Sequence, residues 1–288
     1  MRRYLQFVSF GALGIILAGC VHLGVAYAPE KAIEGTPDME TVLDGLAAND
    51  TLVDSFEAKG KIILRSEVEA DQLLPQATIA FQRPDKLYAK GVHRTGAQAF
   101  EIVGNGENFY IGLRNHEPYY GMEGQRIEGI PFAISPADVA REMFLPEDWS
   151  AIDANAVHVE AIEKTETATF ATFTLGPKRR PYRRVVVSGP PWIVERTERL
   201  DKQGRPVAIT YRSDYRIIDG VRFPSTIEAV FPTEAARVRF ELRDIKMNAE
   251  LDEHLFDVTR PADSPRAQAA QTAADGPSTG GNRGRIGP

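Results

Sequence analysis

The sequence predicts a mainly β protein of the α+β class, built on a single strongly curved antiparallel sheet. Three observations carry this prediction. About ten segments alternate apolar and polar side chains, as strands do when one face of a sheet is dry and the other wet. Only two segments show the helical period of apolar residues. Because strands that are neighbours in sequence are usually neighbours in space, one continuous sheet is the simplest arrangement.

The first element expected is an amphipathic helix that begins near residue 36. Thr36 is a suitable N-cap, and Pro37 follows at the first helical position, where its missing amide hydrogen costs nothing. Asn49 and Asp50 end the pattern. The apolar residues of this segment recur at helical spacing: Met39, Val42, Leu43 and Leu46.

Strands follow from residue 55, where the apolar period changes from helical to two. The segment 104–108, Gly-Asn-Gly-Glu-Asn, has the composition of a hairpin loop rather than of a dinucleotide-binding loop. The strands expected in this half are 56–65, 78–82, 86–92, 100–103, 109–113 and one that starts at Tyr119.

A second helix is expected at residues 135–145, inside the run of strands. Ser135 is its N-cap, Pro136 stands in the first turn, Asp138 completes the capping pattern, and Pro146 ends the helix. Its apolar face is large for so short a helix, so it must cover other apolar surface or be covered by it. That face consists of Val139, Ala140, Met143 and Phe144.

The second half of the chain is strand after strand, joined by short turns. Asp219-Gly220 predicts a two-residue hairpin, because both positions tolerate positive φ. The clearest alternation sets Val238 and Phe240 against a charged opposite face. Near residue 210 the two faces are Val207, Ile209 and Tyr211 on one side and Ala208, Thr210 and Arg212 on the other. The strands expected are 170–175, 184–187, 192–200, 207–212, 226–231 and 237–243.

Composition divides the chain into four parts. Residues 1–19 read as a leader, 20–35 as a tether, 36–261 as the folded domain and 262–288 as a tail. The tail is rich in Ala, Gly, Gln and Pro and contains no aromatic residue. Such a segment cannot bury enough surface to offset its ordering entropy, so we expect it to be disordered.

The leader has the three parts of a secretory signal peptide. Arg2 and Arg3 form a basic start, residues 7–17 form an uncharged apolar run, and Ala18 and Gly19 are the small residues that a signal peptidase requires. The apolar run is shorter than the roughly 20 residues needed to cross a bilayer. The leader is therefore expected to be removed.

The residues Leu17-Ala18-Gly19-Cys20 resemble the lipobox of bacterial lipoproteins, and Cys20 is the only cysteine. The resemblance implies cleavage before Cys20, a diacylglyceryl thioether on its sulfur and acylation of the new amino group, which together give a stable anchor. With Val21 rather than Asp next to the anchor, the sorting pattern of these lipoproteins favours the outer membrane. The alternative is an ordinary signal peptide with a chance cysteine at its end.

Four short segments, in order, resemble the LolA/LolB-like lipoprotein carrier superfamily. They are Ser-Phe-Glu-Ala-Lys-Gly at 55–60, Phe-Gln-Arg-Pro-Asp-Lys-Leu at 81–87, Asp-Gly-Val-Arg-Phe-Pro at 219–224 and Leu-Asp-Glu-His-Leu-Phe-Asp at 251–257. The resemblance implies an unclosed β-barrel with a helical lid, and a hydrophobic cavity that accepts acyl chains. It also implies that the protein transfers or holds lipidic cargo without catalysis.

Few residues point to chemistry. The sequence has no motif of a metalloprotease, serine hydrolase or phosphate-binding loop, and its five histidines lack metal-ligand spacing, so we expect no catalytic site, metal or other cofactor. A basic cluster at Lys178, Arg179, Arg180, Arg183 and Arg184 is either a site for anionic headgroups or an acidic partner, or a solvated loop. The candidates for lining a cavity, with ordinary core packing as the alternative, are Phe81, Phe109, Tyr211, Phe223 and Phe240.

The function expected is that of a lipid-anchored envelope protein, at the outer membrane and facing the periplasm. It would bind or carry a lipid, lipoprotein or other amphiphile in an apolar cavity, without catalysis. The alternative is an envelope scaffold with the same fold, whose partner is another protein. The net charge of −6 argues against a nucleic-acid partner, which usually leaves a basic footprint.

Overall fold

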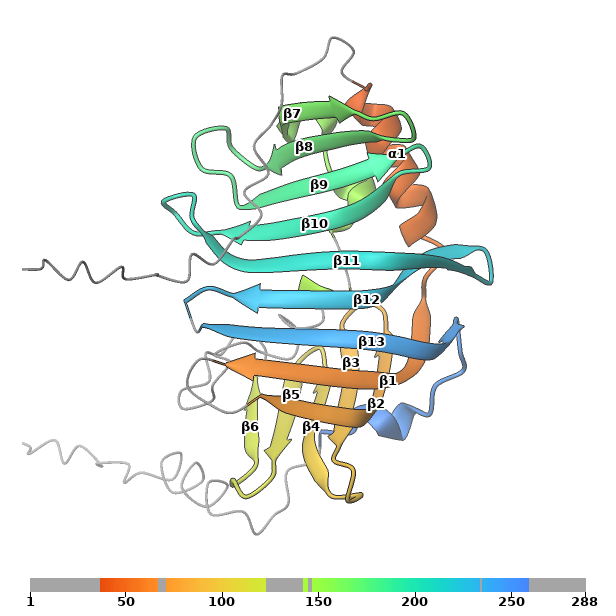
Figure 1. The fold of residues 1–288 in the computed structure, drawn as a ribbon, viewed down its shortest axis with the longest axis vertical. Helices are drawn as coiled ribbons and strands as arrows, with labels where there is room; N and C mark the ends of the chain where they lie inside the picture. Colours follow the sequence, from red (N-terminus) through yellow and green to blue (C-terminus); the bar gives the residue numbers. More distant parts are fainter. Residues whose placement is uncertain (1–36, 67–70, 123–141, 145–146, 234, 259–288) are drawn as a thin grey trace, which may run out of the picture.

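A computed structural model describes residues 37–66, 71–122, 142–144, 147–233 and 235–258. Thirteen strands of this part of the chain form one antiparallel sheet, in the order β6-β5-β4-β3-β2-β1-β13-β12-β11-β10-β9-β8-β7. Figure 1 shows β3 to β6 turned across the direction of β11 to β13, so that the sheet curls around one of its faces. We call this face the inner face and the opposite one the outer face. The predicted fold class, a strongly curved and unclosed antiparallel sheet, is confirmed.

The first six strands follow the helix α1 (Met39–Asp50), and the other seven follow two short 3-10 helices. The first group is β1 (Ser55–Ser66), β2 (Gln72–Gln82), β3 (Lys86–Val92), β4 (Gln98–Asn105), β5 (Asn108–Leu113) and β6 (Tyr119–Met122). The second group, after η1 (Trp149–Ala151) and η2 (Ala154–Ala156), is β7 (Val157–Lys164), β8 (Thr169–Leu175), β9 (Arg183–Gly189), β10 (Ile193–Leu200), β11 (Pro206–Ile218), β12 (Val221–Phe231) and β13 (Ala236–Met247). A last turn, η3 (Glu253–Phe256), follows the sheet.

Two meanders, β1 to β6 and β7 to β13, make up the sheet, and the pairing of β1 with β13 joins them. The first and last strands of the domain therefore lie side by side at its centre, while β6 and β7 are its two edges. Gly60 lies in this seam opposite Leu242, where a Cβ atom would stand 2.3 Å from the backbone oxygen of Glu241. Only glycine allows the two strands to approach so closely.

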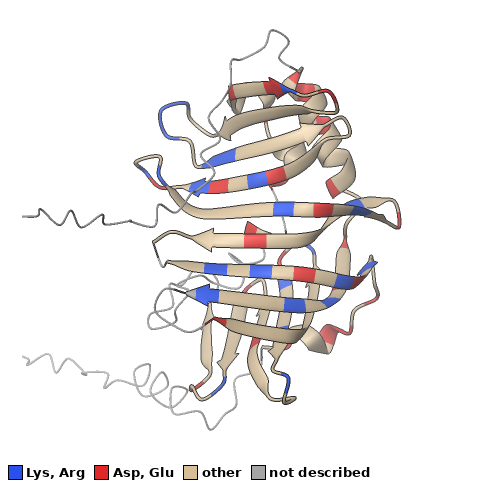
Figure 2. Cartoon of the chain, in the orientation of Figure 1, with Lys and Arg blue, Asp and Glu red and all other residues tan. Residues whose placement is uncertain are grey.

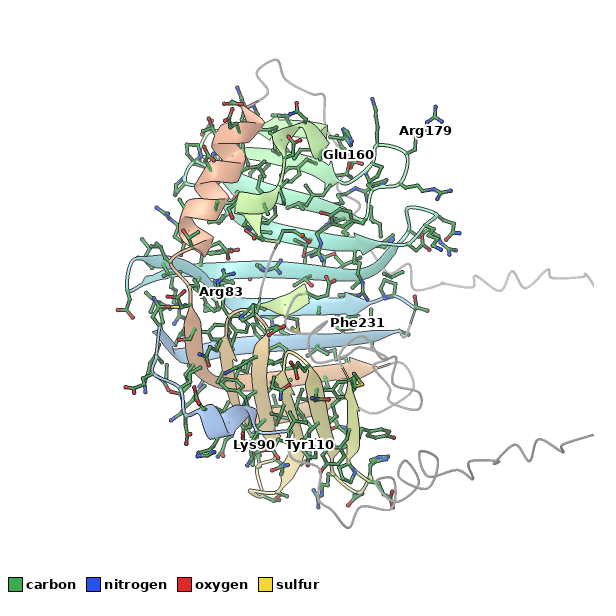
Figure 3. All side chains as sticks on the ribbon, turned by 180° about the vertical axis from the view of Figure 1, so that it is seen from behind. Arg83, Lys90, Tyr110, Glu160, Arg179 and Phe231 are labelled. Atoms are coloured by element: carbon green, nitrogen blue, oxygen red, sulfur yellow. The ribbon has the colours of Figure 1, made fainter. Side chains whose placement is uncertain are left out.

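The helix α1 packs on the inner face, against β8 to β10 (Figures 1 and 3). Its N-cap is Asp38, whose side chain accepts a hydrogen bond from the backbone N–H of Glu40. The predicted start at Thr36 and Pro37 was therefore wrong, because the Asp38 carboxylate caps the helix two residues later. Its end at Asn49 and Asp50 is confirmed. Three of its predicted apolar residues are buried: Val42, Leu43 and Leu46.

Two apolar clusters lie on the inner face. One joins β1 to β4 with β11 to β13 and takes in Met143 and Phe144. The other joins α1 and η1 to β7 to β10. A two-residue cluster, Phe109 and Ile111, lies near the β6 edge. The structure thus has two covered apolar regions along one sheet, which meet near the end of α1.

Figure 2 shows charged residues of both signs on neighbouring strands of the sheet, and on the outer face they form ion pairs between strands, which we call the ion-pair ladder. Arg184 bridges Glu160 on β7 and Glu198 on β10, at 2.7 Å to each. Glu228 on β12 meets Arg237 on β13 at 2.9 Å, and Glu241 on β13 meets Lys61 on β1 at 2.7 Å. This regular charge pattern explains the wet side of the predicted alternation, and it confirms Val238 and Phe240 as inward-facing positions.

The strand pattern of the sequence is largely confirmed, with two exceptions. The strand β7 was not predicted. On β11 the buried face is the one that bears Ala208, Thr210 and Arg212, and not the more apolar face opposite it. The Asp219-Gly220 hairpin is confirmed, with φ of 51° and 85° at its two residues. The leader, Cys20, the tether, the tail and residues 135–141 and 145 of the second predicted helix lie outside the described residues.

Candidate functional site

Aromatic side chains from four strands converge on the inner face. Phe56 on β1 lies 5.7 Å from Phe81 on β2 and 5.0 Å from Phe223 on β12, measured between ring centroids. Phe144 enters from outside the sheet and lies 5.5 Å from Phe56 and 5.6 Å from Phe240 on β13. We call Phe56, Phe81, Phe223 and Phe240 the aromatic floor. The ring of Phe144 packs on this floor, tilted against Phe56 and edge-on to Phe240.

The structure brings three of the five predicted cavity residues together in this floor: Phe81, Phe223 and Phe240. Phe109 lies on the same face, since the strand pairings align it through Gly104 and Leu87 with Phe81. It belongs, however, to the small cluster at the β6 edge. Tyr211 is 42% exposed on the outer face, where the guanidinium of Arg196 lies 5.9 Å from its ring centroid. It is not part of the floor.

Next to the aromatic floor lie three inward-facing arginines, the buried Arg183 on β9 and Arg212 on β11 and the partly exposed Arg199 on β10. We call them the arginine cluster. Glu142 points into it, with Oε1 at 3.2 Å from Nη2 of Arg183 and 3.6 Å from Nε of Arg199. Arg212 donates to the backbone oxygen of Glu142 at 2.9 Å and to Oγ1 of Thr197 at 3.1 Å. The inner face therefore changes from apolar to cationic between β12 and β9.

The predicted basic cluster is divided by the sheet. Lys178, Arg179 and Arg180 are exposed in the turn before β9. Arg183 points inward to Glu142 and also meets Glu147 at 2.5 Å. Arg184, next in the strand, points outward to the ion-pair ladder. Since neighbouring strand residues face opposite sides, one basic stretch supplies two unrelated sites.

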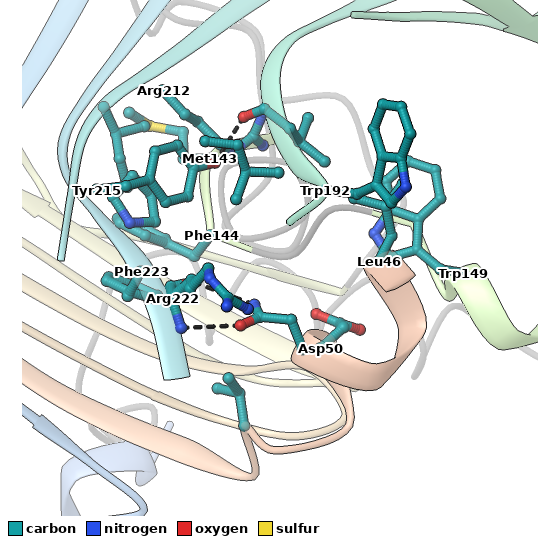
Figure 4. Close-up of a pocket in the computed structure, with 16 residues that line it drawn as sticks. Leu46, Asp50, Met143, Phe144, Trp149, Trp192, Arg212, Tyr215, Arg222 and Phe223 are labelled. Atoms are coloured by element: carbon teal, nitrogen blue, oxygen red, sulfur yellow. Dashed lines mark hydrogen bonds between the residues drawn. The ribbon is translucent and has the colours of Figure 1, made fainter. Parts of the chain in front are cut away.

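A cleft opens between the end of α1, residues 143–144 and the strands β10 to β12 (Figure 4). Its free volume is about 60 Å³, room for a few water molecules only. Its walls are mixed: Trp149 and Trp192 are apolar, whereas Asp50, Arg212 and Tyr215 are polar. The cleft is thus the part of the inner face that Met143 and Phe144 leave unfilled.

Hydrogen bonds fix the α1 side of the cleft. The Asn49 side chain donates to the backbone oxygen of Arg222 at 3.1 Å and accepts from its backbone nitrogen at 2.8 Å. Nη2 of Arg83 meets Oδ2 of Asp50 at 2.8 Å. Burial raises the pKa of the Asp50 carboxyl, and the charge of Arg83 and its hydrogen bond partly oppose the rise. The helix end is therefore held to β12 and to the start of the β2–β3 turn.

On the strand side, the hydroxyl of Tyr215 donates to the backbone oxygen of Val194 at 2.6 Å. Burial raises the pKa of this phenol, which keeps it a neutral donor. Burial also lowers the pKa of the Arg212 guanidinium, and the charge of Arg183 acts in the same direction. The charges of Tyr215 and Glu142 act in the opposite direction and raise the pKa of Arg212.

The described residues contain no group of three or more His, Cys, Asp or Glu side chains placed to hold a metal ion. None of their helices combines the length and the apolarity needed to cross a membrane.

Sequence reasoning did not find the polar part of the site. It treated Met143 and Phe144 as a helix face in need of a partner, and the structure shows their partners. It passed over Arg199 and Arg212, because a charged residue in a strand pattern is normally assigned to the wet face. It also passed over Glu142, which lies within the predicted helix 135–145 but outside its apolar face. The available signal was an unusual density of arginine on strands predicted to have one dry face.

Solved structures share this architecture at low sequence identity. A DUF1329 family protein from Desulfovibrio piger matches with a TM-score of 0.52 and 12% identity, over 77% of this chain and 98% of its own. A LolA superfamily protein from Nitrosomonas europaea matches with a TM-score of 0.51 and 14% identity, over 77% and 98%. An outer membrane lipoprotein-sorting protein domain from Vibrio parahaemolyticus matches with a TM-score of 0.50 and 13% identity, over 76% of this chain and 97% of its own.

These similarities establish the fold. The chain has a LolA-like fold, as the four sequence segments predicted. No protein-family model and no curated protein matches the sequence.

Proposed function

Starting from the LolA-like fold, we propose that this chain binds the acyl part of a lipid, a lipoprotein or another amphiphile on its inner face, without catalysis. The apolar part of the ligand would take the place that Met143 and Phe144 occupy on the aromatic floor. The driving force is removal of apolar surface from water, which requires no reactive group.

The observation that carries this proposal is the way the aromatic floor is covered. Within the described residues, three members of the larger apolar cluster lie outside the strands: Met143 and Phe144, which enter from outside the sheet, and Val53 in the turn that leads into β1. The other cluster is covered by the twelve-residue helix α1 and by η1. A floor built by four strands and filled by two neighbouring side chains is a surface that a flexible apolar chain can occupy in their place.

The small volume of the cleft sets a condition on the proposal. About 60 Å³ cannot hold an acyl chain, so ligand and Phe144 must exclude one another. Removal of the Phe144 ring should therefore favour the ligand, because the ligand no longer competes with a well-packed side chain.

Anchoring completes the proposed function. We propose that Cys20 carries the lipid anchor, that residues 1–19 are removed, and that residues 20–35 tether the domain of residues 36–261 to the membrane. The lipobox residues and the lipoprotein-sorting name of one structural relative support a place in the cell envelope, at the outer membrane and facing the periplasm.

The filled interior also favours a second candidate. If Met143 and Phe144 are permanent core, the protein is an envelope scaffold that uses the same fold to hold a protein partner. The small free volume is the observation on its side.

Native mass spectrometry separates the two. The chain from residue 20 with Cys20→Ser lacks the anchor but keeps every described residue. A carrier co-purifies with lipid, and Phe144→Ala raises the bound fraction. The matched control is Phe173→Ala, which removes an equally buried ring from the other cluster and should not raise it. A chain that is free of lipid in all three forms contradicts the carrier proposal and favours the scaffold.

A further inference from the structure

The arginine cluster gathers three guanidinium groups around Glu142. Oε1 of Glu142 meets Arg183 and Arg199, its backbone oxygen accepts from Arg212, and Arg183 also meets Glu147. Arg183 is 8% exposed, Arg212 is 3% exposed and Glu142 is 3% exposed. Buried charges are normally paired and fully hydrogen-bonded, because an unpaired one is costly.

Hydrogen bonding around Glu142 and Arg183 is nevertheless incomplete. Oε2 of Glu142 is buried and has no hydrogen-bond partner, and the same holds for Nη1 of Arg183. The Glu142 carboxylate thus engages the arginines through Oε1 alone. Guanidinium groups bind carboxylate and phosphate best through two parallel hydrogen bonds, so Glu142 is a poor fit to the site it fills.

The cluster adjoins the aromatic floor in the sheet register. Arg212 on β11 is the direct partner of Ile227 on β12, which is in turn the partner of Phe240. One step along the inner face therefore leads from a guanidinium to the apolar surface. A ligand with an anionic head and an apolar tail can touch both.

Residues 142–144 already display this combination. Glu142 places its carboxylate among the arginines, and the next two residues place apolar side chains on the floor. Three consecutive residues thus present charge and tail in the order that an anionic amphiphile would.

We propose that the arginine cluster is the head-group subsite for an anionic amphiphile, with a carboxylate or phosphate head, and that residues 142–144 occupy the site as an internal stand-in for this ligand. The proposal rests on the function proposed above for the apolar tail. It adds that the bound amphiphile is anionic and that its head displaces the Glu142 carboxylate.

Binding of matched probes to the chain from residue 20 with Cys20→Ser tests the subsite. The probes are dodecanoate, dodecyl phosphate, dodecanol and inorganic phosphate, measured by calorimetry at pH 8, where dodecanoate is ionised. Glu142→Gln keeps the shape of the side chain and removes the competing charge. We expect it to tighten binding of the two anionic dodecyl probes by about tenfold or more and to leave dodecanol within about twofold. The control Glu160→Gln, on the outer face, should change none of the four.

Each result decides between the claims. If Glu142→Gln tightens the binding of dodecanoate and of dodecanol equally, the head-group subsite is overturned. The same holds if it tightens neither although dodecanol binds. In both cases the proposed function still stands. Failure of all dodecyl probes in every variant overturns both. If inorganic phosphate binds as tightly as dodecyl phosphate, the cluster binds a free anion, and the proposal that its ligand is an amphiphile is overturned.

A second variant keeps the test open if Glu142→Gln does not fold. Arg199 is the most accessible member of the cluster, with a side chain 34% exposed. Arg199→Gln in the otherwise unchanged protein should abolish the preference for dodecanoate over dodecanol. Retention of that preference overturns the proposal.

Discussion

Single residues of the site show how burial and charge oppose one another. Glu142 and Arg183 are both buried and mutually paired, yet Glu142 keeps one polar atom and Arg183 two without a hydrogen bond. Asp50 is the simpler case, since its partner Arg83 meets it with a 2.8 Å ion pair at the mouth of the cleft. Both cases place charge at the border of an apolar region, where a ligand with one polar end would lie.

Asp50 gives a prediction on pH. Burial, the larger effect, raises the pKa of its carboxyl above 3.8, while Arg83 lowers it. We expect carboxyl NMR to show Asp50 titrating above pH 3.8, and Arg83→Gln to move its pKa further upward. Because the folded-state pKa is the raised one, the stability from protonated Asp50 is present below pH 3.8 and is lost as pH rises through the folded pKa.

A distant carboxyl serves as the control. Hydrogen bonds from the backbone of Arg205 lower the pKa of Asp201, which lies in the β10–β11 turn. The change Arg83→Gln should leave that pKa where it is. A fall in the Asp50 pKa on this change would contradict the assigned causes.

At the scale of elements, local pattern predicted most strands and missed those set by distant partners. β13 was predicted from strict alternation, and its inner face is the predicted one. β7 was missed because a register shift between Val159 and Ala161 breaks its alternation, and because only Ile162 is buried.

The burial of the less apolar face of β11 and the polar half of the site, both missed from the sequence, have the same cause. Arg212 is buried because it bonds the backbone of Glu142, seventy positions away in sequence. No local rule reveals such a partner. The aromatic floor was found in large part, since apolar residues at period two are inward-facing by default.

The seam between β1 and β13 gives the element-scale prediction. Gly60→Ala places a Cβ atom 2.3 Å from a backbone oxygen of the partner strand, so the two strands must part. We expect the free energy of unfolding to fall by about 3 kcal/mol or more, measured by urea denaturation. Gly96→Ala is the control, because nothing lies within 4 Å there. It should cost only about 1 to 2 kcal/mol, from its left-handed backbone. A smaller loss at Gly60 than at Gly96 would show that the seam can move apart freely.

At the scale of the whole molecule, the proposed lipid anchor at Cys20 would tether the half-closed sheet to a membrane. If Cys20 carries the anchor, the protein in its native cells should sediment with membranes, and mass spectrometry should find acyl groups on the peptide that starts at residue 20. Cys20→Ser should release the protein to the soluble fraction or leave its leader uncleaved. A membrane-bound, processed Cys20→Ser protein would mean that another feature anchors the chain.

The central claim is that ligand and residues 142–144 compete for one surface. Methyl NMR of labelled methionines measures this directly, because Met143 is 2% exposed on the aromatic floor and Met122 is 60% exposed far from it. On addition of dodecanoate, we predict that the Met143 methyl leaves its buried environment and becomes accessible to a soluble relaxation agent, while Met122 is unchanged. If dodecanoate binds and Met143 stays protected, or if it fails to bind, the inner face of this sheet is not a ligand site.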